Sequence, residues 1–224
     1  MLSKRDRMTV VLFDFDGVIV RKDSFESYLR VRLRRQPWRL LAVLPLLPFV
    51  PLLLATVAGK GWLARLFVRV STCGIGEAGF RADIDAFGRE FARRPGMLAE
   101  EALSRLRAHV ASGERVLIVS AAAQPLLDAI LDQAGVTGVE AVGSSVVVGW
   151  TGVRALFHNY GSAKLQTLAS LGIEPPWAMA YSDSRSDLPI LAAARHAVLV
   201  NPPQRDLDAV RRALGDQVEV LRSS

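Results

Sequence analysis

The sequence predicts an α/β fold, a Rossmann-like, doubly wound parallel sheet with an inserted, mainly helical cap. Two observations lead to this prediction. Short apolar, β-rich runs alternate with amphipathic helical runs over residues 114–202, and helical and apolar sequence interrupts the alternation over residues 23–112. A chain of 224 residues is long enough for one core with a sizeable insertion. We therefore expect residues 1–22 and 113–224 to form the core and residues 23–112 to form the cap.

The first two strands of the expected core share one pattern. Residues 9–18, TVVLFDFDGV, predict a short buried strand that ends in acidic residues and glycine. Residues 114–135 repeat the form, with a strand to Val119, a turn of small residues and an amphipathic helix that Gly135 ends. Both strands are expected to deliver their carboxyl ends to a ligand site.

The remaining elements continue the alternation. Residues 140–152 predict two short strands that meet around 143–145, and residues 163–172 predict a helix closed by glycine. A strand, an acidic loop, a helix and a last strand follow over residues 177–202.

Two carboxylates stand at the end of the first strand. Asp14 and Asp16 are two residues apart, and Gly17 permits a sharp turn beside a ligand. Close carboxylates repel each other unless a cation or a proton intervenes, so the pattern suits a magnesium site with one nucleophilic oxygen and one proton carrier. Turn or helix-cap aspartates are the alternative interpretation.

Three later strand ends or helix starts carry further candidates. Asp183 lies just beyond a strand, where a cation at Asp14 would find another oxygen ligand. Asp187 could cap a helix that has Pro189 in its first turn. Ser120 offers a hydroxyl near a helix start that can bind an anion, although an ordinary N-cap explains it too. Lys164 opens a helix, an unfavourable place for a cation unless an anion or carboxylates are near, and a surface lysine is the alternative.

The order of these residues resembles the haloacid dehalogenase-like phosphatase superfamily, whose four motifs occur in this order at strand ends of a Rossmann-like core. The resemblance is to the phosphoserine phosphatase-like subfamily. It implies that Asp14 is a nucleophile that forms an aspartyl-phosphate, and that Asp16 is a general acid and then a general base. Val18 departs from the pattern, because a hydroxyl residue usually follows the glycine.

The resemblance also implies roles for the other motif residues. Ser120 and Lys164 would hold the phosphoryl oxygens, and Lys164 would restrain Asp14. The Asp14 carboxylate, the Asp16 main-chain carbonyl and Asp183 would ligate Mg²⁺, and Asp187 would support that magnesium site.

An uncharged apolar segment, residues 40–59, lies inside the expected cap and contains prolines 45, 48 and 51. As a helix it would be about 30 Å long, enough to cross the hydrocarbon core of a bilayer. A single crossing would place Asp14 and Ser120 on opposite sides of the membrane, and the prolines would break or kink the helix. We therefore expect residues 38–62 to form an interfacial or re-entrant element, with a buried cap helix or an oligomer contact as the alternative.

The charge distribution supports a membrane surface as a partner. The net charge is +6, and residues 21–69 alone carry ten basic and two acidic residues, a local charge of +8. Basic residues that flank the apolar segment would meet anionic headgroups at the cytoplasmic face of the inner membrane. They are Arg30, Arg32, Arg34, Arg35, Arg39, Lys60, Arg65 and Arg69. Nucleic acid is not an expected partner, because no aromatic stacking residues are interleaved with the arginines.

Linking segments such as LRRQP, LLAVLPLLP and CGIG resemble phosphatidylglycerophosphatase C and its relatives. This resemblance implies phosphatidylglycerophosphate as the substrate, hence a role in phospholipid biosynthesis. A soluble phosphatase of a small metabolite such as phosphoserine is one alternative. A catalytically idle membrane-docking protein is another.

Cysteine and histidine usage adds little to these predictions. A single cysteine, Cys73, cannot form an internal disulfide, fits a reducing compartment and argues against a cysteine-based zinc site. The N-terminal basic residues precede only a short apolar run, so no export signal is expected. Core or surface roles are expected for the three histidines, His109, His158 and His196.

Overall fold

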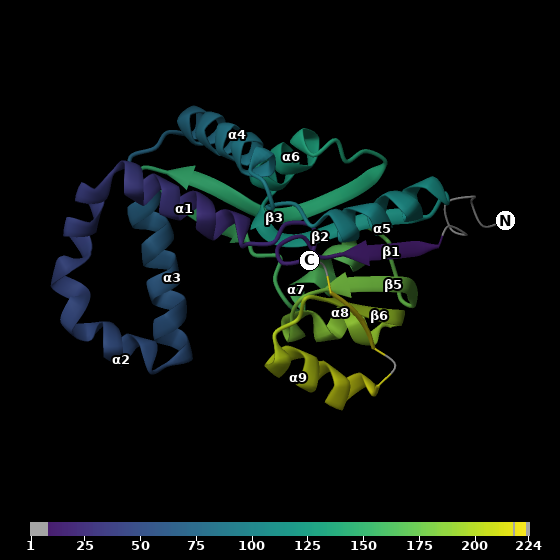
Figure 1. The fold of residues 1–224 in the computed structure, drawn as a ribbon. Helices are drawn as coiled ribbons and strands as arrows, with labels where there is room; N and C mark the ends of the chain where they lie inside the picture. Colours follow the sequence, from purple (N-terminus) through teal and green to yellow (C-terminus); the bar gives the residue numbers. More distant parts are fainter. Residues whose placement is uncertain (1–8, 217, 223–224) are drawn as a thin grey trace.

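The sheet at the centre of the fold contains seven strands within the described residues (Figure 1). The computed structural model describes residues 9–216 and 218–222. The strands are β1 Val10–Phe13, β2 Arg115–Ala123, β3 Val139–Gly149, β4 Gly152–Phe157, β5 Trp177–Ser182, β6 Ala194–Val200 and β7 Glu219–Leu221. They lie in the order β4-β3-β2-β1-β5-β6-β7, and only β3 and β4 pair antiparallel among the described strands. The predicted α/β fold with a mainly parallel sheet is confirmed.

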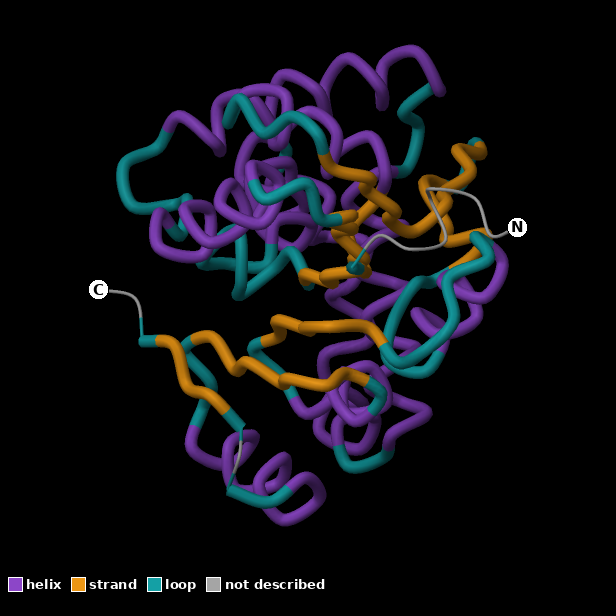
Figure 2. The backbone as a smooth tube through the Cα atoms, turned by 90° about the vertical axis from the view of Figure 1, so that its right-hand side faces the viewer, coloured by secondary structure: helices purple, strands orange, loops and turns teal. Residues whose placement is uncertain are grey.

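Helices cover both faces of this sheet (Figure 2). Between β1 and β2 the chain forms α1 Ser24–Arg35, the 3₁₀ helix η2 Pro37–Phe49, α2 Val50–Leu54, α3 Val57–Thr72, α4 Glu77–Arg93 and α5 Glu100–Ala111. The later helices are α6 Gln124–Gln133, α7 Ala163–Ser170, the 3₁₀ turn η3 Arg185–Asp187, α8 Leu188–Ala192 and α9 Gln204–Leu214. Because α4 packs on α6 and α5 packs on β2, the assignment of the whole range 23–112 as a separate cap stays a prediction.

Two hydrophobic clusters, one on each face, hold the sheet between the helices. Successive side chains of a strand point to opposite faces. Accordingly, Val11 and Phe13 belong to one cluster and Leu12 to the other, and all three are buried. Burial on both faces explains why β1 is a continuous apolar run rather than an alternating one.

Two predicted element boundaries are wrong. The strand β2 does not end at Val119 but continues to Ala123, with an irregular register between these residues. The strand β3 does not turn around residues 143–145; it runs through them and changes partner there, from parallel pairing with β2 to antiparallel pairing with β4. The turn to β4 lies at Trp150 and Thr151. Pairing on both sides outweighs the local turn preference of the Gly-Ser-Ser sequence.

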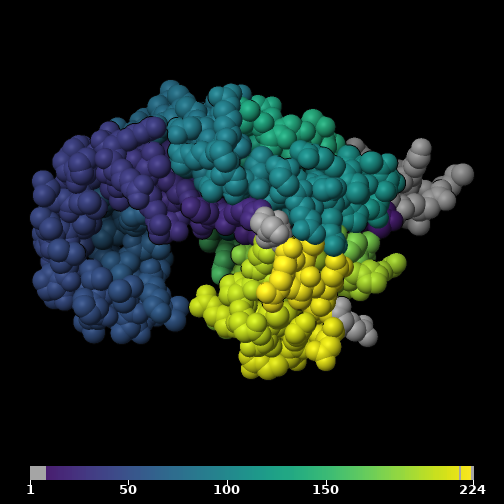
Figure 3. All heavy atoms as spheres, viewed as in Figure 1, coloured from purple at the N-terminus to yellow at the C-terminus, as the bar shows by residue number. Residues whose placement is uncertain are grey.

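The segment of residues 37–72, which we call the arm, projects from the rest of the molecule (Figures 1 and 3). It leaves through η2 and α2 and returns through α3. Gly59 lets α3 approach the preceding turn closely, since a Cβ there would lie 2.1 Å from the carbonyl oxygen of Leu53. Pro45 and Pro48 lie inside η2, which confirms that the prolines interrupt an α-helix.

Hydrogen bonds close the base of the arm. Arg32 Nε donates to the Ser71 carbonyl at 3.0 Å, and Arg39 Nη1 donates to the Val70 carbonyl at 2.9 Å. The backbone N–H of Val153 in β4 donates to the Thr72 hydroxyl at 2.8 Å. The two ends of the arm are therefore tied to each other and to the edge of the sheet.

The surface of the arm is apolar and open. By length and composition alone, Pro37–Leu54 is long and apolar enough to cross a membrane, and 6% of it is buried. The exposed large apolar side chains of the arm are Trp38, Leu40, Leu41, Leu44, Leu47, Phe49, Leu52, Leu54, Val57 and Trp62. A buried cap helix, one alternative for this segment, is therefore excluded.

The expectation that every flanking basic residue faces headgroups is wrong. Arg39 is buried, and Arg32 forms an ion pair with Asp83 in addition to its bond to the arm. Further ion pairs join Arg35 to Asp83 and Arg30 to Glu26. Those that remain exposed, without an ion pair to any described residue, are Arg34, Lys60, Arg65 and Arg69.

Candidate active site

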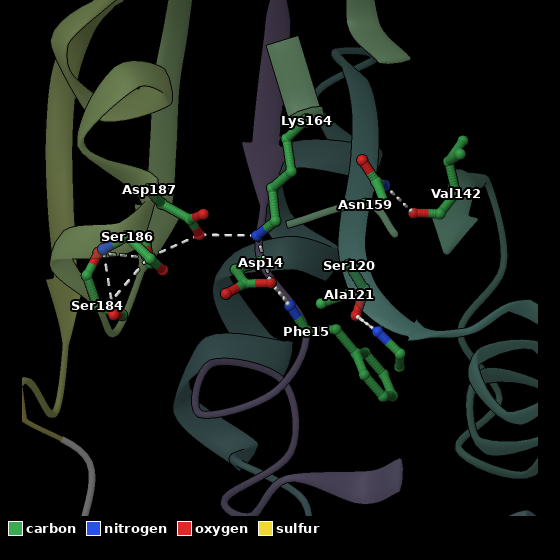
Figure 4. Close-up of polar contacts among 12 residues, drawn as sticks. Asp14, Phe15, Ser120, Ala121, Val142, Asn159, Lys164, Ser184, Ser186 and Asp187 are labelled. Atoms are coloured by element: carbon green, nitrogen blue, oxygen red, sulfur yellow. Dashed lines mark hydrogen bonds and ion pairs between the residues drawn. The ribbon is translucent and has the colours of Figure 1, made fainter. Parts of the chain in front are cut away.

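The predicted site residues gather at the carboxyl edge of the sheet, as the order of the strands requires. Asp14 follows β1, Ser120 lies in β2, Asp183 follows β5, and Lys164 is the second residue of α7. Figure 4 shows Lys164 extending between Asp14 and Asp187, with Ser120 close by on the neighbouring strand. Residues as far apart as 14 and 187 in the sequence thus form one cluster.

Lys164 joins two of the carboxylates. Its Nζ lies 2.8 Å from Asp14 Oδ1 and 2.7 Å from Asp187 Oδ2, and its side chain is 2% exposed. Burial lowers the pKa of Lys164, but Asp14 and Asp187 outweigh this effect, so the pKa lies above its usual value. The lysine is therefore charged, and the two carboxylates explain why a cation opens this helix.

Asp187 does not cap the helix that follows it. The N-terminus of α8 receives no hydrogen bond from the Asp187 side chain. Instead, Oδ2 accepts hydrogen bonds from Lys164 at 2.7 Å and from the Ser182 hydroxyl at 2.9 Å. The residue is 1% exposed, so the capping interpretation is wrong and the contacts within the site account for Asp187.

Asp14 is held in one orientation by its neighbours. Its Oδ1 accepts from Lys164 and from the Phe15 N–H at 2.7 Å, and its own N–H donates to the Tyr181 carbonyl at 2.8 Å. Burial raises the pKa of Asp14, and the nearby charges of Asp187 and Asp183 add to the rise against the opposing effect of Lys164. The second oxygen, Oδ2, takes part in neither of these two contacts.

Asp16 is the second carboxylate of the loop. Its Oδ1 accepts a hydrogen bond of 2.9 Å from the N–H of Ser24, the first residue of α1. Burial and the charge of Asp23 raise the pKa of Asp16 to about 7, whereas the N–H and hydroxyl of Ser24 act to lower it. A carboxyl group with this pKa can both give and accept a proton near neutral pH.

Gly17 brings the first loop against Asp183. The glycine has a φ of 80°, and a Cβ on it would lie 2.2 Å from Asp183 Oδ2. A larger residue would therefore both strain the backbone and displace the carboxylate. Burial and the charge of Asp187 raise the pKa of Asp183 to about 6.

Ser120 is fully buried, and its hydroxyl accepts a hydrogen bond of 3.0 Å from the Ala122 N–H. The interpretation as a helix N-cap is wrong, because α6 begins only at Gln124. The next two residues, Ala121 and Ala122, line the cavity of the site, and the Ala122 N–H is taken up by its hydrogen bond to Ser120.

The carboxylate cluster fits a divalent cation. Asp14, Asp16 and Asp183 all have raised pKa values, because burial and the charges of neighbouring carboxylates disfavour their ionised forms. Lys164 offsets this effect only in part, at Asp14 and Asp183. A hard cation with oxygen ligands would relieve this repulsion. The implied magnesium set of the Asp14 and Asp183 carboxylates with the Asp16 main-chain carbonyl therefore suits the residues present.

Two further observations bear on that metal. Within the described residues, no group of three or more His, Cys, Asp or Glu side chains is placed to hold a metal ion, so the magnesium set that includes the Asp16 main-chain carbonyl stays a prediction. Asp187 Oδ1 is buried and has no hydrogen-bond partner among the described residues. A buried oxygen of this kind is a ready acceptor for a water molecule of a hydrated cation.

The sequence did not point to a buried polar network behind Lys164. Ser144 donates to the Ala121 carbonyl at 2.8 Å and accepts from the Asn159 N–H at 2.9 Å. Asn159 in turn donates to the Val142 carbonyl, as Figure 4 shows, and accepts from Thr167 in α7. The network ties the end of β2, just after Ser120, to the helix of Lys164. In the sequence, the only sign of this network is a few polar residues within an apolar strand, and the same pattern is typical of a turn.

A cavity of about 890 Å³ opens from these residues toward the arm. Asp14, Asp16, Lys164 and Asp183 line one end. The apolar residues of the lining on α1 and α3 are Phe25, Leu29, Leu63, Ala64, Phe67 and Val68. Figure 3 shows the molecule hollowed between the arm and the rest of the chain. The site is therefore polar at the sheet and apolar at the arm.

The three histidines have different places. His109 is partly buried on α5, where it contacts Glu114 and its Nε2 is 2.9 Å from the Tyr181 hydroxyl, and His196 is exposed on β6. His158 lines the cavity and stacks on Tyr160, with ring centroids 5.6 Å apart. Partial burial lowers the pKa of His158.

Known proteins resemble this chain in sequence and in fold. Residues 11–192 match the family model of haloacid dehalogenase-like hydrolases. A Mycobacterium tuberculosis protein described as a probable phosphatase is 34% identical over 106 residues, which are 46% of this chain and 37% of that protein. The chain thus spans well under half the length of this relative.

Two solved structures share the fold. A Bordetella pertussis protein of unknown function has a TM-score of 0.67 and 21% identity, over 95% of this chain and 97% of that one. A phosphoserine phosphohydrolase-like protein from Francisella tularensis has a TM-score of 0.61 and 17% identity, over 96% of both chains. With the family model covering most of the sequence, the chain belongs to the haloacid dehalogenase-like hydrolase family.

Proposed function

We propose that this chain is a magnesium-dependent phosphomonoester hydrolase that works through an aspartyl-phosphate intermediate. The observation that carries the proposal is the setting of Asp14. Its Oδ1 is fixed by Lys164 and the Phe15 N–H, Asp183 lies beside the same loop, and Asp16 follows two residues later. Phosphoryl transfer needs in-line placement and charge neutralisation more than unusual covalent reactivity, and this arrangement offers both.

In the first step Asp14 Oδ2 attacks the phosphorus atom, and the bond from phosphorus to the alcohol oxygen breaks. Asp16 gives its proton to that oxygen, so a neutral alcohol leaves. In the second step Asp16 takes a proton from water, whose oxygen attacks phosphorus, and inorganic phosphate and free Asp14 result. Lys164 and Ser120 would hold the phosphoryl oxygens. Magnesium, when bound, supplies positive charge to these oxygens.

We further propose a lipid phosphomonoester, phosphatidylglycerophosphate, as the substrate, with phosphatidylglycerol and phosphate as products. Support comes from the cavity, whose far wall is formed by apolar side chains of α3 such as Leu63 and Phe67. A soluble metabolite would not need this wall. The resemblance of the linking segments to phosphatidylglycerophosphatase C points to the same substrate.

The arm would hold the enzyme at the cytoplasmic face of the inner membrane. Its large apolar side chains are exposed, and its chain leaves and returns at one base, which suits a re-entrant or interfacial element rather than a single crossing. The exposed cations Lys60, Arg65 and Arg69 would contact anionic headgroups, each contributing about 1 kcal/mol near the surface.

Phosphate release from phosphatidylglycerophosphate in mixed micelles, compared with phosphoserine and glycerol 3-phosphate, tests these proposals. We expect magnesium-dependent turnover with a strong preference for the lipid, and its loss in Asp14→Asn, which keeps the side-chain shape but removes the nucleophile. Preference for phosphoserine would leave the chemistry intact and refute the lipid substrate. Lipid turnover that survives Asp14→Asn would refute the mechanism, and no turnover of any ester would favour an idle docking protein.

A further inference from the structure

Ser24 stands where the first catalytic loop meets the first helix of the insertion. Its N–H donates to Asp16 Oδ1 at 2.9 Å. The residue is completely buried, and its hydroxyl makes no hydrogen bond of normal geometry to a described residue, although it lies near enough to Asp16 to lower the pKa of that carboxyl. Leaving a buried hydroxyl unpaired costs about 1–3 kcal/mol, so its presence beside the proposed general acid calls for an explanation.

The loop itself provides no hydroxyl at the position after Gly17. Val18 is fully buried and belongs to the hydrophobic core, so its side chain cannot donate to a carboxylate. Asp23, the N-cap of α1, uses its carboxylate to accept from the Glu26 N–H. The donors that α1 offers to Asp16 therefore come from Ser24.

We propose that Ser24 is a positioning residue for Asp16, which it keeps turned toward the oxygen of the leaving alcohol. The N–H fixes one carboxylate oxygen, and the buried hydroxyl is a second donor for the carboxylate once the proton has gone to the alcohol. This role goes beyond the proposed function and does not depend on a lipid substrate. It predicts that loss of Ser24 impairs proton donation more than phosphate binding.

The placement of Ser24 also allows its two donors to be removed one at a time. Ser24 is the first residue of α1, the position at which proline is tolerated in a helix, because its missing N–H has no intrahelical partner. Asp23 has φ −58° and ψ 111°, which is compatible with a following proline. Ser24→Ala removes the hydroxyl alone and is the decisive variant. Ser24→Pro removes both donors while it keeps the helix, but its ring replaces an N–H that points at Asp16 Oδ1 and therefore also pushes on that carboxylate.

Single-turnover hydrolysis of p-nitrophenyl phosphate and phenyl phosphate, similar in shape but different in leaving-group basicity, provides the test. The p-nitrophenolate leaves without much protonation, whereas phenolate needs the proton of Asp16. We expect Ser24→Pro to slow cleavage of phenyl phosphate about 10- to 100-fold and that of p-nitrophenyl phosphate less than about 3-fold, within the range for general acid catalysis. Ser24→Ala should also slow cleavage of phenyl phosphate more than that of p-nitrophenyl phosphate, but only several-fold.

The matched control is Ser27→Ala in the same helix, whose hydroxyl donates to the Asp23 carbonyl and not to Asp16. It should leave both rates unchanged. Thermal unfolding shows whether the variants remain folded, and inhibition by inorganic phosphate shows whether they still bind the anion. If Ser24→Pro does not fold, the result for Ser24→Ala decides the question. Equal slowing of both esters, or none, would overturn the role of Ser24. A wild-type protein that cleaves neither these two esters nor phosphatidylglycerophosphate would overturn the proposed hydrolase function instead, and with it this role.

Discussion

At the scale of single residues, the site contains more buried carboxylates than cations to balance them. Lys164 compensates Asp14 and Asp187, but Asp16 and Asp183 add two further carboxylates in the same neighbourhood. Buried like charges cost folding free energy, which a bound cation or a proton can recover. Raised pKa values of this kind are typical of sites adapted to catalysis rather than to stability.

Replacing Asp16 by Asn should stabilise the magnesium-free protein at alkaline pH. The pKa of Asp16 rises from 3.8 to about 7 on folding, because burial disfavours the carboxylate. The folded state therefore binds this proton more tightly than the unfolded state, and stability falls as pH increases from about 4 to about 7. At pH 8 we expect Asp16→Asn to gain about 2–4 kcal/mol in the free energy of unfolding, on the scale of 1.4 kcal/mol per pKa unit.

Urea unfolding in EDTA at pH 8 and near pH 4 measures this effect, which should vanish at the lower pH. Asp85→Asn is the control, because Asp85 forms a half-exposed ion pair with Arg89 and should change stability little at either pH. A loss of stability in Asp16→Asn at pH 8 would contradict the charge imbalance that we describe.

The site residues could be predicted from the sequence to a large extent, because each stands at a strand end or a helix start and parallel strands share one edge. Lys164 and Asp187 show the limit. Considered alone, Lys164 could be a surface residue and Asp187 a helix cap. Only the ion pair between them, which joins positions 23 residues apart, shows that both belong to the site. Ser24 gave no signal, since its hydrogen bond to Asp16 depends on how the chain turns after Gly17.

At the scale of elements, apolar runs predicted the strands well and their ends poorly. The length of β3 depends on partners on both sides, β2 and then β4, that no local pattern reveals. The arm illustrates the opposite case. Its three prolines were enough to exclude a continuous α-helix, and the structure has a 3₁₀ helix followed by a short α-helix.

The turn between α2 and α3 should be sensitive to one methyl group at Gly59. A Cβ at this position would collide with the Leu53 carbonyl oxygen, so Gly59→Ala should separate the two helices. Gly61→Ala is the matched control in the same helix, because its Cβ would meet only the flexible Arg65 side chain at 3.4 Å and alanine favours helix by about 1 kcal/mol.

Hydrogen exchange over residues 50–65 gives the readout. We expect faster exchange in Gly59→Ala, unchanged or slower exchange in Gly61→Ala, and a thermal midpoint close to that of the wild type in both, since residues 50–65 lie outside the two main hydrophobic clusters. If Gly59→Ala exchanged as slowly as the wild type, the close packing of this turn would be refuted.

At the scale of the whole molecule, the cavity connects the chemistry of the sheet with the surface of the arm. Asp14 and Asp16 lie at one end and α3 at the other, and α1 spans the distance from Ser24 beside Asp16 to the base of the arm. The same α1 thus contacts the proposed general acid and carries the proposed membrane element.

Removing apolar side chains from the arm should weaken binding to vesicles that contain phosphatidylglycerol. Leu41, Leu44 and Leu47 are each about half exposed or more, and burial of such a side chain contributes roughly 1.5–3 kcal/mol. We expect the triple change to Asn to lower vesicle affinity at least about 100-fold, since 1.4 kcal/mol corresponds to a factor of ten. Cosedimentation measures it.

Hydrolysis of p-nitrophenyl phosphate by this triple variant should stay at the wild-type rate, because these side chains do not line the cavity. Leu156→Asn is the control: this leucine is 75% exposed on β4, outside the arm, and should not affect vesicle binding. Equal vesicle affinity of the triple variant and the wild type would exclude the arm as the membrane contact.

The hydrogen bonds that Arg32 and Arg39 make at the base of the arm have a consequence for how the sequence of the arm can evolve. Because Arg32 and Arg39 bind main-chain carbonyls of Ser71 and Val70, they impose no requirement on the side chains that they join. The segment between Arg39 and Val70 can therefore lengthen, shorten or be exchanged for another while the sheet and its carboxylates stay in place. Exchange of this segment would let proteins with the same sheet and carboxylates act on different substrates, either at a membrane or in solution.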